Sequence, residues 1–199
     1  TMFQLFETVN QSENPRTCNS NDFSQLTIAY AYDEVFNFYY HDVLDLLRSW
    51  QVKLVKTSPL HDQALPKNID GLIIGGGFPE LYDELLKQNL KYITSLQACI
   101  QAGLPVYAEC GGYMYLAMVN LIPAEVAMTG KLVALGYYEG KTCRDSIIAP
   151  ANTPVRGHQF HYSRVNPTVV NYPWAVEIGK PNQQTMQQDG YADKNIFAS

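Results

Sequence analysis

The rest of this chain is organised around Tyr107-Ala108-Glu109-Cys110-Gly111-Gly112-Tyr113-Met114. The apolar residues 104–108 predict a short buried strand, and the apolar run after the two glycines predicts a helix. A cysteine at such a sharp turn projects from the sheet, and flanking glycines give the crowded backbone room. The helix N-terminus would favour a thiolate and offer free N–H groups to a developing oxyanion. The stretch therefore predicts that Cys110 is a nucleophile, with an inert buried cysteine as the alternative.

The residues upstream of this turn predict an α/β fold with a parallel sheet. Strands are expected at residues 26–31, 52–57 and 70–74. Between the first two, Asn37 is a candidate N-cap. The apolar positions that follow it fall on one helix face: Val43, Leu44, Leu46, Leu47 and Trp50. A strand–helix–strand order predicts a parallel pair with a right-handed crossover.

Three glycines, Gly75 to Gly77, follow the strand at residues 70–74. They permit close backbone approach to a ligand, although a plain tight turn is the alternative. No Gly-Lys-Ser/Thr follows, so the run is not a phosphate loop. One long amphipathic helix is expected from residue 81 to 100, with Gly103 as its C-cap. Because loops at strand carboxyl ends share one crevice, the glycine amides should lie opposite Cys110.

The chain is less regular downstream of the cysteine turn. Strands are expected within residues 128–139, 146–150, 157–164 and 195–199. Residues 1–22 are polar and turn-rich, as in a linker.

Composition narrows the class of protein. The chain has 199 residues, 46% of them hydrophobic, which suits one compact domain with a sizeable core. Its formal charge of −5 gives no reason to expect nucleic acid as a partner. Its four cysteines form no CxxC pair, so we expect no metal site and a reducing cytoplasm. No apolar run is long enough to span a bilayer, so no membrane partner is expected.

Five stretches of this sequence recur, in the same order, in one known family: residues 28–40, 58–62, 75–82, 107–112 and 156–164. On these motifs, residues 26–199 resemble the class I glutamine amidotransferase domains of the cobyrinic acid a,c-diamide synthase family. Five ordered motifs are far more specific than any one of them.

The resemblance implies a flavodoxin-like, mostly parallel sheet with helices on both faces. Cys110 would attack the glutamine side-chain amide, form a thioester and release ammonia. The N–H groups of Gly76, Gly77 and Gly111 would hold the oxyanion, and His161, Tyr162 and Ser163 would bind glutamine. No cofactor is expected in this domain. Ammonia would pass to a separate synthetase domain, which uses ATP and Mg²⁺ to amidate the a and c carboxylates of cobyrinic acid.

The resemblance also suggests domain boundaries. Residues 1–25 would be a linker from a preceding synthetase domain, and residues 26–199 a C-terminally truncated amidotransferase domain. In the family the sequence continues past the position of Ser199 into a motif with the catalytic histidine. His158 and His161 are substitutes, but their spacing from Cys110 is short for a general base. We therefore expect the 199-residue chain to fold but to turn over little glutamine.

Three other interpretations stay open. One is the amidotransferase of a sibling pathway, for cobyric acid or a peptidoglycan precursor. Another is a catalytically silent domain that docks on its synthetase partner. The third is a cysteine hydrolase of similar fold.

Overall fold

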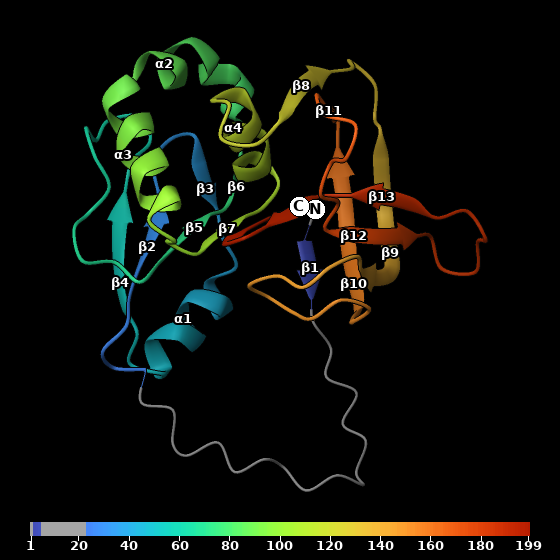
Figure 1. The fold of residues 1–199 in the computed structure, drawn as a ribbon, viewed down its shortest axis with the longest axis horizontal. Coiled ribbons are helices and arrows are strands. Elements are labelled where there is room, and N and C mark those ends of the chain that lie inside the picture. Colours follow the sequence, from blue (N-terminus) through green and yellow to red (C-terminus); the bar gives the residue numbers. More distant parts are fainter. Residues whose placement is uncertain (1, 5–22) are drawn as a thin grey trace, which may run out of the picture.

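The computed structural model describes residues 2–4 and 23–199. A six-stranded sheet flanked by helices lies beside a five-stranded antiparallel sheet (Figure 1). Two short two-stranded ribbons lie outside these sheets: β3 (Phe36–Phe38) with β6 (Gly76–Gly77), and β8 (Ala124–Met128) with β11 (Ser163–Pro167).

The six-stranded sheet has the spatial order β14-β15-β7-β5-β2-β4. Its strands are β2 (Thr27–Ala31), β4 (Lys53–Thr57), β5 (Gly71–Ile74), β7 (Val106–Ala108), β14 (Tyr191–Asp193) and β15 (Ile196–Ala198). All neighbours are parallel except β14 and β15. Numbered along the chain, the parallel strands follow the order 2-1-3-4-5, which is the flavodoxin-like order. The predicted fold class is confirmed.

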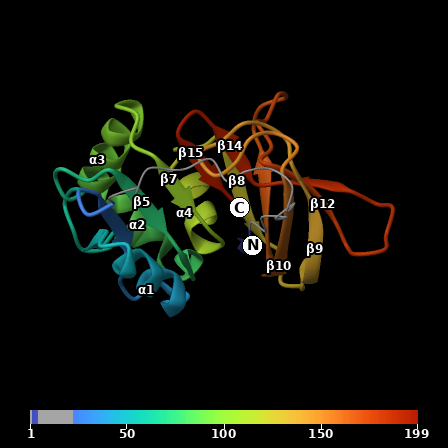
Figure 2. The same cartoon turned by 90° about the horizontal axis from the view of Figure 1, so that it is seen from below.

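Helices cover both faces of this sheet. They are α1 (His41–Ser49), the 3₁₀ turn η1 (Pro79–Tyr82), α2 (Asp83–Gln88), α3 (Leu90–Gln101) and α4 (Gly111–Met118). The crossovers β2-to-β4 and β5-to-β7 run in opposite directions across the sheet, so right-handed connections place α1 and α3 on opposite faces. Figure 2 shows these two helices on either side of the sheet.

The antiparallel sheet has the order β1-β10-β9-β12-β13. Its strands are β1 (Met2–Gln4), β9 (Ala134–Thr142), β10 (Pro154–His161), β12 (Val176–Gly179) and β13 (Gln187–Asp189). The sequence did not predict this sheet as a separate layer.

The strand β15 joins the two hydrophobic cores. Ile196 and Ala198 in this strand belong to the core between the parallel sheet and its helices. Phe197, between them, points into the core under the antiparallel sheet, where its ring stacks on Tyr107 at 5.9 Å. Because side chains alternate between the two faces of the strand, β15 contributes residues to both hydrophobic cores.

The prediction for the first helix was partly wrong. Its N-cap is Tyr40, with no side-chain cap, instead of Asn37. Only Leu44 of the predicted apolar face is buried, whereas Val43, Leu46 and Trp50 are about half exposed. The helix thus contacts the sheet along a narrower line than its apolar pattern suggested.

The prediction of one long helix was also wrong. Three pieces, η1, α2 and α3, replace it, and Asn89 stands at the second break. Its side chain accepts from the Tyr92 N–H and donates to the carbonyls of Pro59 and Asp62, both at 2.8 Å. The amide group therefore begins α3 and ties it to a neighbouring loop. The C-cap of α3 is Ala102, and the predicted Gly103 follows it with φ of +97°, as is typical of the residue after a helix.

One further expectation differs from the structure, and another lies mostly outside the described residues. Residues 146–150 form a turn and no strand, because the Ser146 hydroxyl accepts from the nearby Ile148 and Ala149 N–H groups. Of the expected linker, residues 1 and 5–22 lie outside the described residues. Met2–Gln4 instead pairs with β10, with Met2 opposite His158.

Candidate active site

Cys110 forms the sharp turn between β7 and α4. Its backbone has φ of +54° and ψ of −109°, a conformation that is rare for residues other than glycine. Such strain costs of order 1–3 kcal/mol and persists only where the surroundings enforce it. Here the Cys110 N–H donates to the Ser199 carbonyl at 2.8 Å, and its carbonyl accepts from the Met114 N–H at 3.1 Å.

The two glycines after the cysteine are required by close backbone contacts. A Cβ added to Gly111 would lie 2.8 Å from both the N and the O of Gly77. One added to Gly112 would lie 2.1 Å from the Ile74 carbonyl oxygen. The Gly112 N–H also donates to the Gly75 carbonyl at 3.0 Å. The cysteine turn therefore packs directly on the glycine loop, as the sequence predicts.

The glycine loop is held by the short strand β3. Phe36 pairs with Gly77 and Phe38 pairs with Gly76. A Cβ on Gly77 would lie 1.7 Å from the Val35 carbonyl oxygen, and one on Gly76 would lie 3.7 Å from the Cys110 Cβ. The structure thus brings the three predicted oxyanion glycines, Gly76, Gly77 and Gly111, together beside Cys110.

Gly76→Val is expected to impair glutamine hydrolysis more than folding. The φ of Gly76 is not positive, so the effect comes from space: its Cβ would meet the Phe38 Cβ at 3.1 Å, and its methyl groups would enter the gap to Cys110. Loss of one oxyanion donor typically lowers kcat by about 10²–10³-fold. Kinetics beside a thermal melt measures both effects, with Gly76→Ala as the graded control. Unchanged kcat in Gly76→Val would make this loop an ordinary turn.

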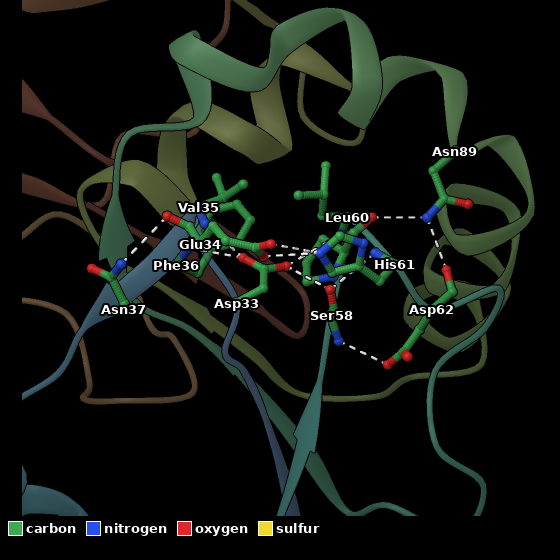
Figure 3. Close-up of polar contacts among 11 residues, drawn as sticks. Asp33, Glu34, Val35, Phe36, Asn37, Ser58, Leu60, His61, Asp62 and Asn89 are labelled. Carbon is green, nitrogen blue, oxygen red and sulfur yellow. Dashed lines mark hydrogen bonds and ion pairs between the residues drawn. The ribbon is translucent and has the colours of Figure 1, made fainter.

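A polar network positions β3 and hence the glycine loop (Figure 3). One carboxylate oxygen of Asp33 accepts from the N–H groups of Val35 and Phe36, at 2.9 and 3.0 Å. The other accepts from the Ser58 hydroxyl at 2.7 Å and the Leu60 N–H at 3.2 Å. The Asp33 carboxylate therefore links the loops after β2 and β4, and its role was not predicted from the sequence.

The loop after β4 is fixed by a second carboxylate, and an exposed histidine–glutamate contact lies beside it. Asp62 accepts from the Ser58 N–H at 2.8 Å and from the Thr57 hydroxyl at 3.1 Å. His61 lies 2.9 Å from Glu34, and both side chains are exposed (Figure 3). The pKa of Glu34 is lowered, first by a hydrogen bond from the backbone and then by the one with His61. An exposed pair of this kind contributes little to stability.

The Tyr39 hydroxyl connects the end of β2 to the glycine loop. It donates to the Ala31 carbonyl at 2.5 Å and accepts from the Gly75 N–H at 2.9 Å. Burial raises the pKa of Tyr39 well above its ordinary value, which keeps this hydroxyl protonated as a donor.

A pocket of about 430 Å³ separates Cys110 and α4 from strands β10, β11 and β13. Among the predicted site residues, Cys110, His161 and Ser163 line it. The His161 Nδ1 lies 2.9 Å from the Ser163 carbonyl oxygen, and the buried Ser163 hydroxyl donates to the Met114 sulfur at 3.4 Å. The structure thus places these two predicted glutamine-binding residues across the pocket from the cysteine.

Tyr162 and His158 do not line this pocket. Side chains alternate along β10, so His158, Phe160 and Tyr162 point to the opposite face from His161. Tyr162 is 44% exposed and packs its ring on Phe160. His158 is exposed and packs on Tyr137. Tyr162 and His158 therefore lie outside the pocket that Cys110, His161 and Ser163 line, and glutamine binding by Tyr162 stays a prediction.

Gln159, Arg164 and Asp189 are among the pocket residues that the sequence reasoning did not single out. Gln159 is fully buried and donates to one carboxylate oxygen of Asp189 at 2.5 Å. The other oxygen accepts from the Gly190 N–H at 2.7 Å. Gln159 lies two residues before His161, so strand alternation was the signal that would have placed it in the pocket.

Two buried tyrosines support the wall of the pocket that α4 forms. Tyr113, which lines it, shares a hydrogen bond of 3.0 Å with the Tyr172 hydroxyl. Burial raises the pKa of Tyr172 to about 12, and burial also raises the pKa of Tyr113 well above its ordinary value. Both hydroxyls therefore stay protonated at neutral pH.

In the described part of the chain, no group of three or more His, Cys, Asp or Glu side chains is placed to hold a metal ion. None of the described helices is both long and apolar enough to cross a membrane.

Residues 27–199 match the family of CobB/CobQ-like glutamine amidotransferase domains. The cobyrinate a,c-diamide synthase of Caldanaerobacter subterraneus is 38% identical over 187 residues, covering 88% of this chain and 41% of the relative. The cobyrinate a,c-diamide synthase of Salmonella typhimurium is 39% identical over 189 residues, covering 87% of this chain and 40% of the relative. The chain thus spans about two fifths of the length of these curated relatives.

Solved structures support the fold alone. PurLQS from Thermotoga maritima superposes with a TM-score of 0.63 at 12% identity, covering 86% of this chain and 84% of that one. A glutamine amidotransferase from the same organism gives a TM-score of 0.59 at 13% identity, covering 87% of this chain and 74% of that one.

Proposed function

This chain belongs to the CobB/CobQ-like glutamine amidotransferase domain family, and we propose from that premise that Cys110 hydrolyses glutamine through a thioester. The observation that carries the proposal is the strained turn at Cys110, packed on the glycine loop and open to a pocket that suits a small molecule. Strain of this kind clusters at functional sites, which an inert buried cysteine does not need.

The proposed reaction has two steps. The Cys110 thiolate attacks the side-chain amide carbon of glutamine, a C–S bond forms, and the C–N bond breaks to release ammonia. Water then loses a proton and attacks the thioester, the C–S bond breaks, and glutamate leaves while the thiolate is restored. Each step passes through a tetrahedral oxyanion that needs hydrogen-bond donors.

The Gly111 N–H is the best-placed donor at the turn. The neighbouring Cys110 and Gly112 N–H groups are occupied by the carbonyls of Ser199 and Gly75. Among the described residues, the Gly111 N–H has no hydrogen-bond acceptor. We assign it to the oxyanion, together with the adjacent loop of Gly76 and Gly77.

His161 is assigned to glutamine binding and not to base catalysis. Its Nδ1 is directed at the Ser163 carbonyl, which orients the ring within the pocket. Protonation of the leaving amide nitrogen and activation of water each need a proton-transfer group, worth about 10²–10⁴-fold. We leave that role unassigned among the described residues.

For the whole protein we propose the reaction after which the relatives are named, the synthesis of cobyrinate a,c-diamide. Ammonia from Cys110 would pass to a synthetase module in the cytoplasm, which would use ATP and Mg²⁺ to amidate the a and c carboxylates of cobyrinic acid. The 36–44% identity to proteins of that name supports this choice over the sibling pathways. ATP and Mg²⁺ would be held by the synthetase module and have no role at Cys110.

Labelling with a chloromethyl ketone analogue of glutamine tests the proposal. We expect Cys110 to be alkylated first and glutamine to protect it. Cys143 is more exposed, yet burial beside Glu177 raises the pKa of its thiol, and Cys99 is half-buried on α3. Cys18, the remaining cysteine, lies outside the described residues.

Iodoacetamide, which has no glutamine-like part, is the control reagent and should show no protection by glutamine. If the ketone labels Cys143 first, or if glutamine fails to protect Cys110, the assignment of the nucleophile is wrong.

A further inference from the structure

The first end of the glycine loop is fixed by one tyrosine hydroxyl. Tyr39 accepts from the Gly75 N–H at 2.9 Å and donates to the carbonyl of Ala31, the last residue of β2. The Gly75 carbonyl in turn accepts from the Gly112 N–H at 3.0 Å, in the first turn of α4. Both backbone polar groups of Gly75 are therefore occupied, and its peptide planes cannot rotate without breaking a hydrogen bond.

The same tyrosine explains why residue 75 is a glycine. The φ of Gly75 is not positive, so its backbone conformation does not require glycine. An added Cβ, however, would lie 2.7 Å from the Tyr39 Cζ, the atom that carries the hydroxyl, and 2.8 Å from its Cε1. The tyrosine ring therefore lies directly against the backbone of the loop, and the first of the three glycines leaves space for it.

The other end of the loop is held by β3, which Asp33 fixes in turn. The Val35 carbonyl accepts from the Phe78 N–H at 3.1 Å, directly after the loop. Asp33 accepts from the Val35 and Phe36 N–H groups and takes two more hydrogen bonds from the loop after β4 (Figure 3). These four bonds use the roughly four lone-pair sites of a carboxylate. Asp33 is therefore built as a support, with little capacity left to accept a proton.

Between these two anchors, the middle of the loop faces the cysteine. A Cβ added to Gly76 would lie 3.7 Å from the Cys110 Cβ. The oxyanion exists only in the transition state, so its donors accelerate the reaction only if they are in place beforehand. A misplacement of about 1 Å can cost on the order of 10²-fold in rate. Whatever holds the loop in place therefore affects the rate without contacting the substrate.

We propose that Tyr39 and Asp33 are positioning residues for glutamine hydrolysis: each fixes one end of the glycine loop, so that the loop amides meet the oxyanion. Neither side chain lines the Cys110 pocket, so both act through the loop. This gives a role to two sequence motifs, residues 28–40 and 58–62, that the chemistry at Cys110 leaves unexplained. The inference rests on the proposed glutamine hydrolysis and adds the residues that support its oxyanion site.

Tyr39→Phe tests the first anchor, because it removes the hydroxyl and keeps the ring. In a glutamine-hydrolysing protein that carries this chain, we expect kcat to fall by about 10- to 100-fold, since a misplaced loop loses part of its hold on the oxyanion. The dissociation constant of L-glutamine, measured by calorimetry in a Cys110→Ser background, should stay within about twofold, because the lost interaction belongs to the transition state.

Tyr92→Phe is the matched control for this substitution. Tyr92 is a buried tyrosine, and its hydroxyl shares a hydrogen bond of 3.1 Å with that of Thr57 at the end of β4. Each variant leaves former hydrogen-bond partners of the hydroxyl unpaired, so both should melt at a lower temperature than the parent. Only Tyr39→Phe should lower kcat.

Asp33→Ala tests the second anchor, with Asp62→Ala as its control. Both carboxylates bind the loop after β4, Asp62 through the Ser58 N–H at 2.8 Å, but Asp33 also binds the start of β3. We expect both substitutions to lower the melting temperature and Asp33→Ala alone to lower kcat, again by about 10- to 100-fold. Asp33→Asn, which keeps one acceptor oxygen, should recover part of that kcat and provides the measurement if Asp33→Ala does not fold.

The outcomes separate this inference from the function on which it rests. Equal losses of kcat in Tyr39→Phe and Tyr92→Phe, or in Asp33→Ala and Asp62→Ala, overturn the positioning role of the residue concerned. A loss of glutamine binding as large as the loss of kcat overturns it too, because the side chain would then act on the bound ground state. If the parent protein releases no ammonia from glutamine, or releases it without Cys110, the proposed function itself fails.

Discussion

Cys110→Ser is expected to lower kcat for glutamine hydrolysis by on the order of 10⁶-fold in a glutamine-hydrolysing protein that carries this chain. A serine hydroxyl is a far weaker nucleophile than a thiolate at neutral pH. It forms an ester in place of a thioester, and no described base lies ready to activate it. Single-turnover measurement of ammonia release gives the size of the effect.

The fold should survive this change, because serine differs from cysteine by one atom and the turn is held through its backbone. The Cys110 N–H and carbonyl keep their bonds to Ser199 and Met114 in the variant. An unchanged melting temperature is therefore the control. Hydrolysis within tenfold of the parent would show that another residue is the nucleophile.

Gly77→Ala is expected to damage both stability and catalysis. Its Cβ would lie 1.7 Å from the Val35 carbonyl oxygen, a contact that backbone atoms must move apart to relieve. We expect a loss of about 3 kcal/mol in the free energy of unfolding. Because β3 and β6 are paired, the oxyanion donors shift too. We expect kcat to fall by roughly 10²–10³-fold as a result.

Gly71→Ala is the matched control for this substitution. Gly71 is also buried in a strand, but its added Cβ would meet only the Ile28 Cδ1 closely, at 3.0 Å, and that methyl group can rotate away. Urea unfolding of both variants compares them directly. Equal free energies of unfolding for Gly77→Ala and Gly71→Ala would mean that β3 moves aside easily and does not hold the glycine loop in place.

The sequence predicted the parallel sheet well because its strands are short apolar runs bounded by glycine, proline or a helix. The position of Cys110 beside the glycine loop followed from one rule about strand carboxyl ends. The same rule did not reveal why the glycines are needed. The glycines are needed because the backbones of Val35, Ile74 and Gly77 come close to them. Such contacts between segments distant in sequence leave no local sequence pattern.

The antiparallel layer was missed for a physical reason. Its strands pair residues distant in sequence, such as Val176 with Thr142 and Met2 with His158, and carry many polar residues on the exposed face. Periodicity in one strand cannot tell which other strand it will meet. Arg164 and Asp189 reach one pocket only because β11 and β13 do, so neither could be singled out beforehand.

The placement of β15 has a consequence for how the protein is made. This fifth parallel strand pairs with β7, which leaves the ribosome far earlier because the whole antiparallel layer from β9 to β13 is encoded between them. Until β15 emerges, β7 has an open edge, the Cys110 N–H lacks the Ser199 carbonyl, and the two cores lack their shared strand. A sheet whose edge strand must pair with residues far along the chain folds slowly and is prone to mispairing. The cysteine turn is therefore completed late, so a nascent chain acquires the backbone geometry of Cys110 only after both layers have been synthesised.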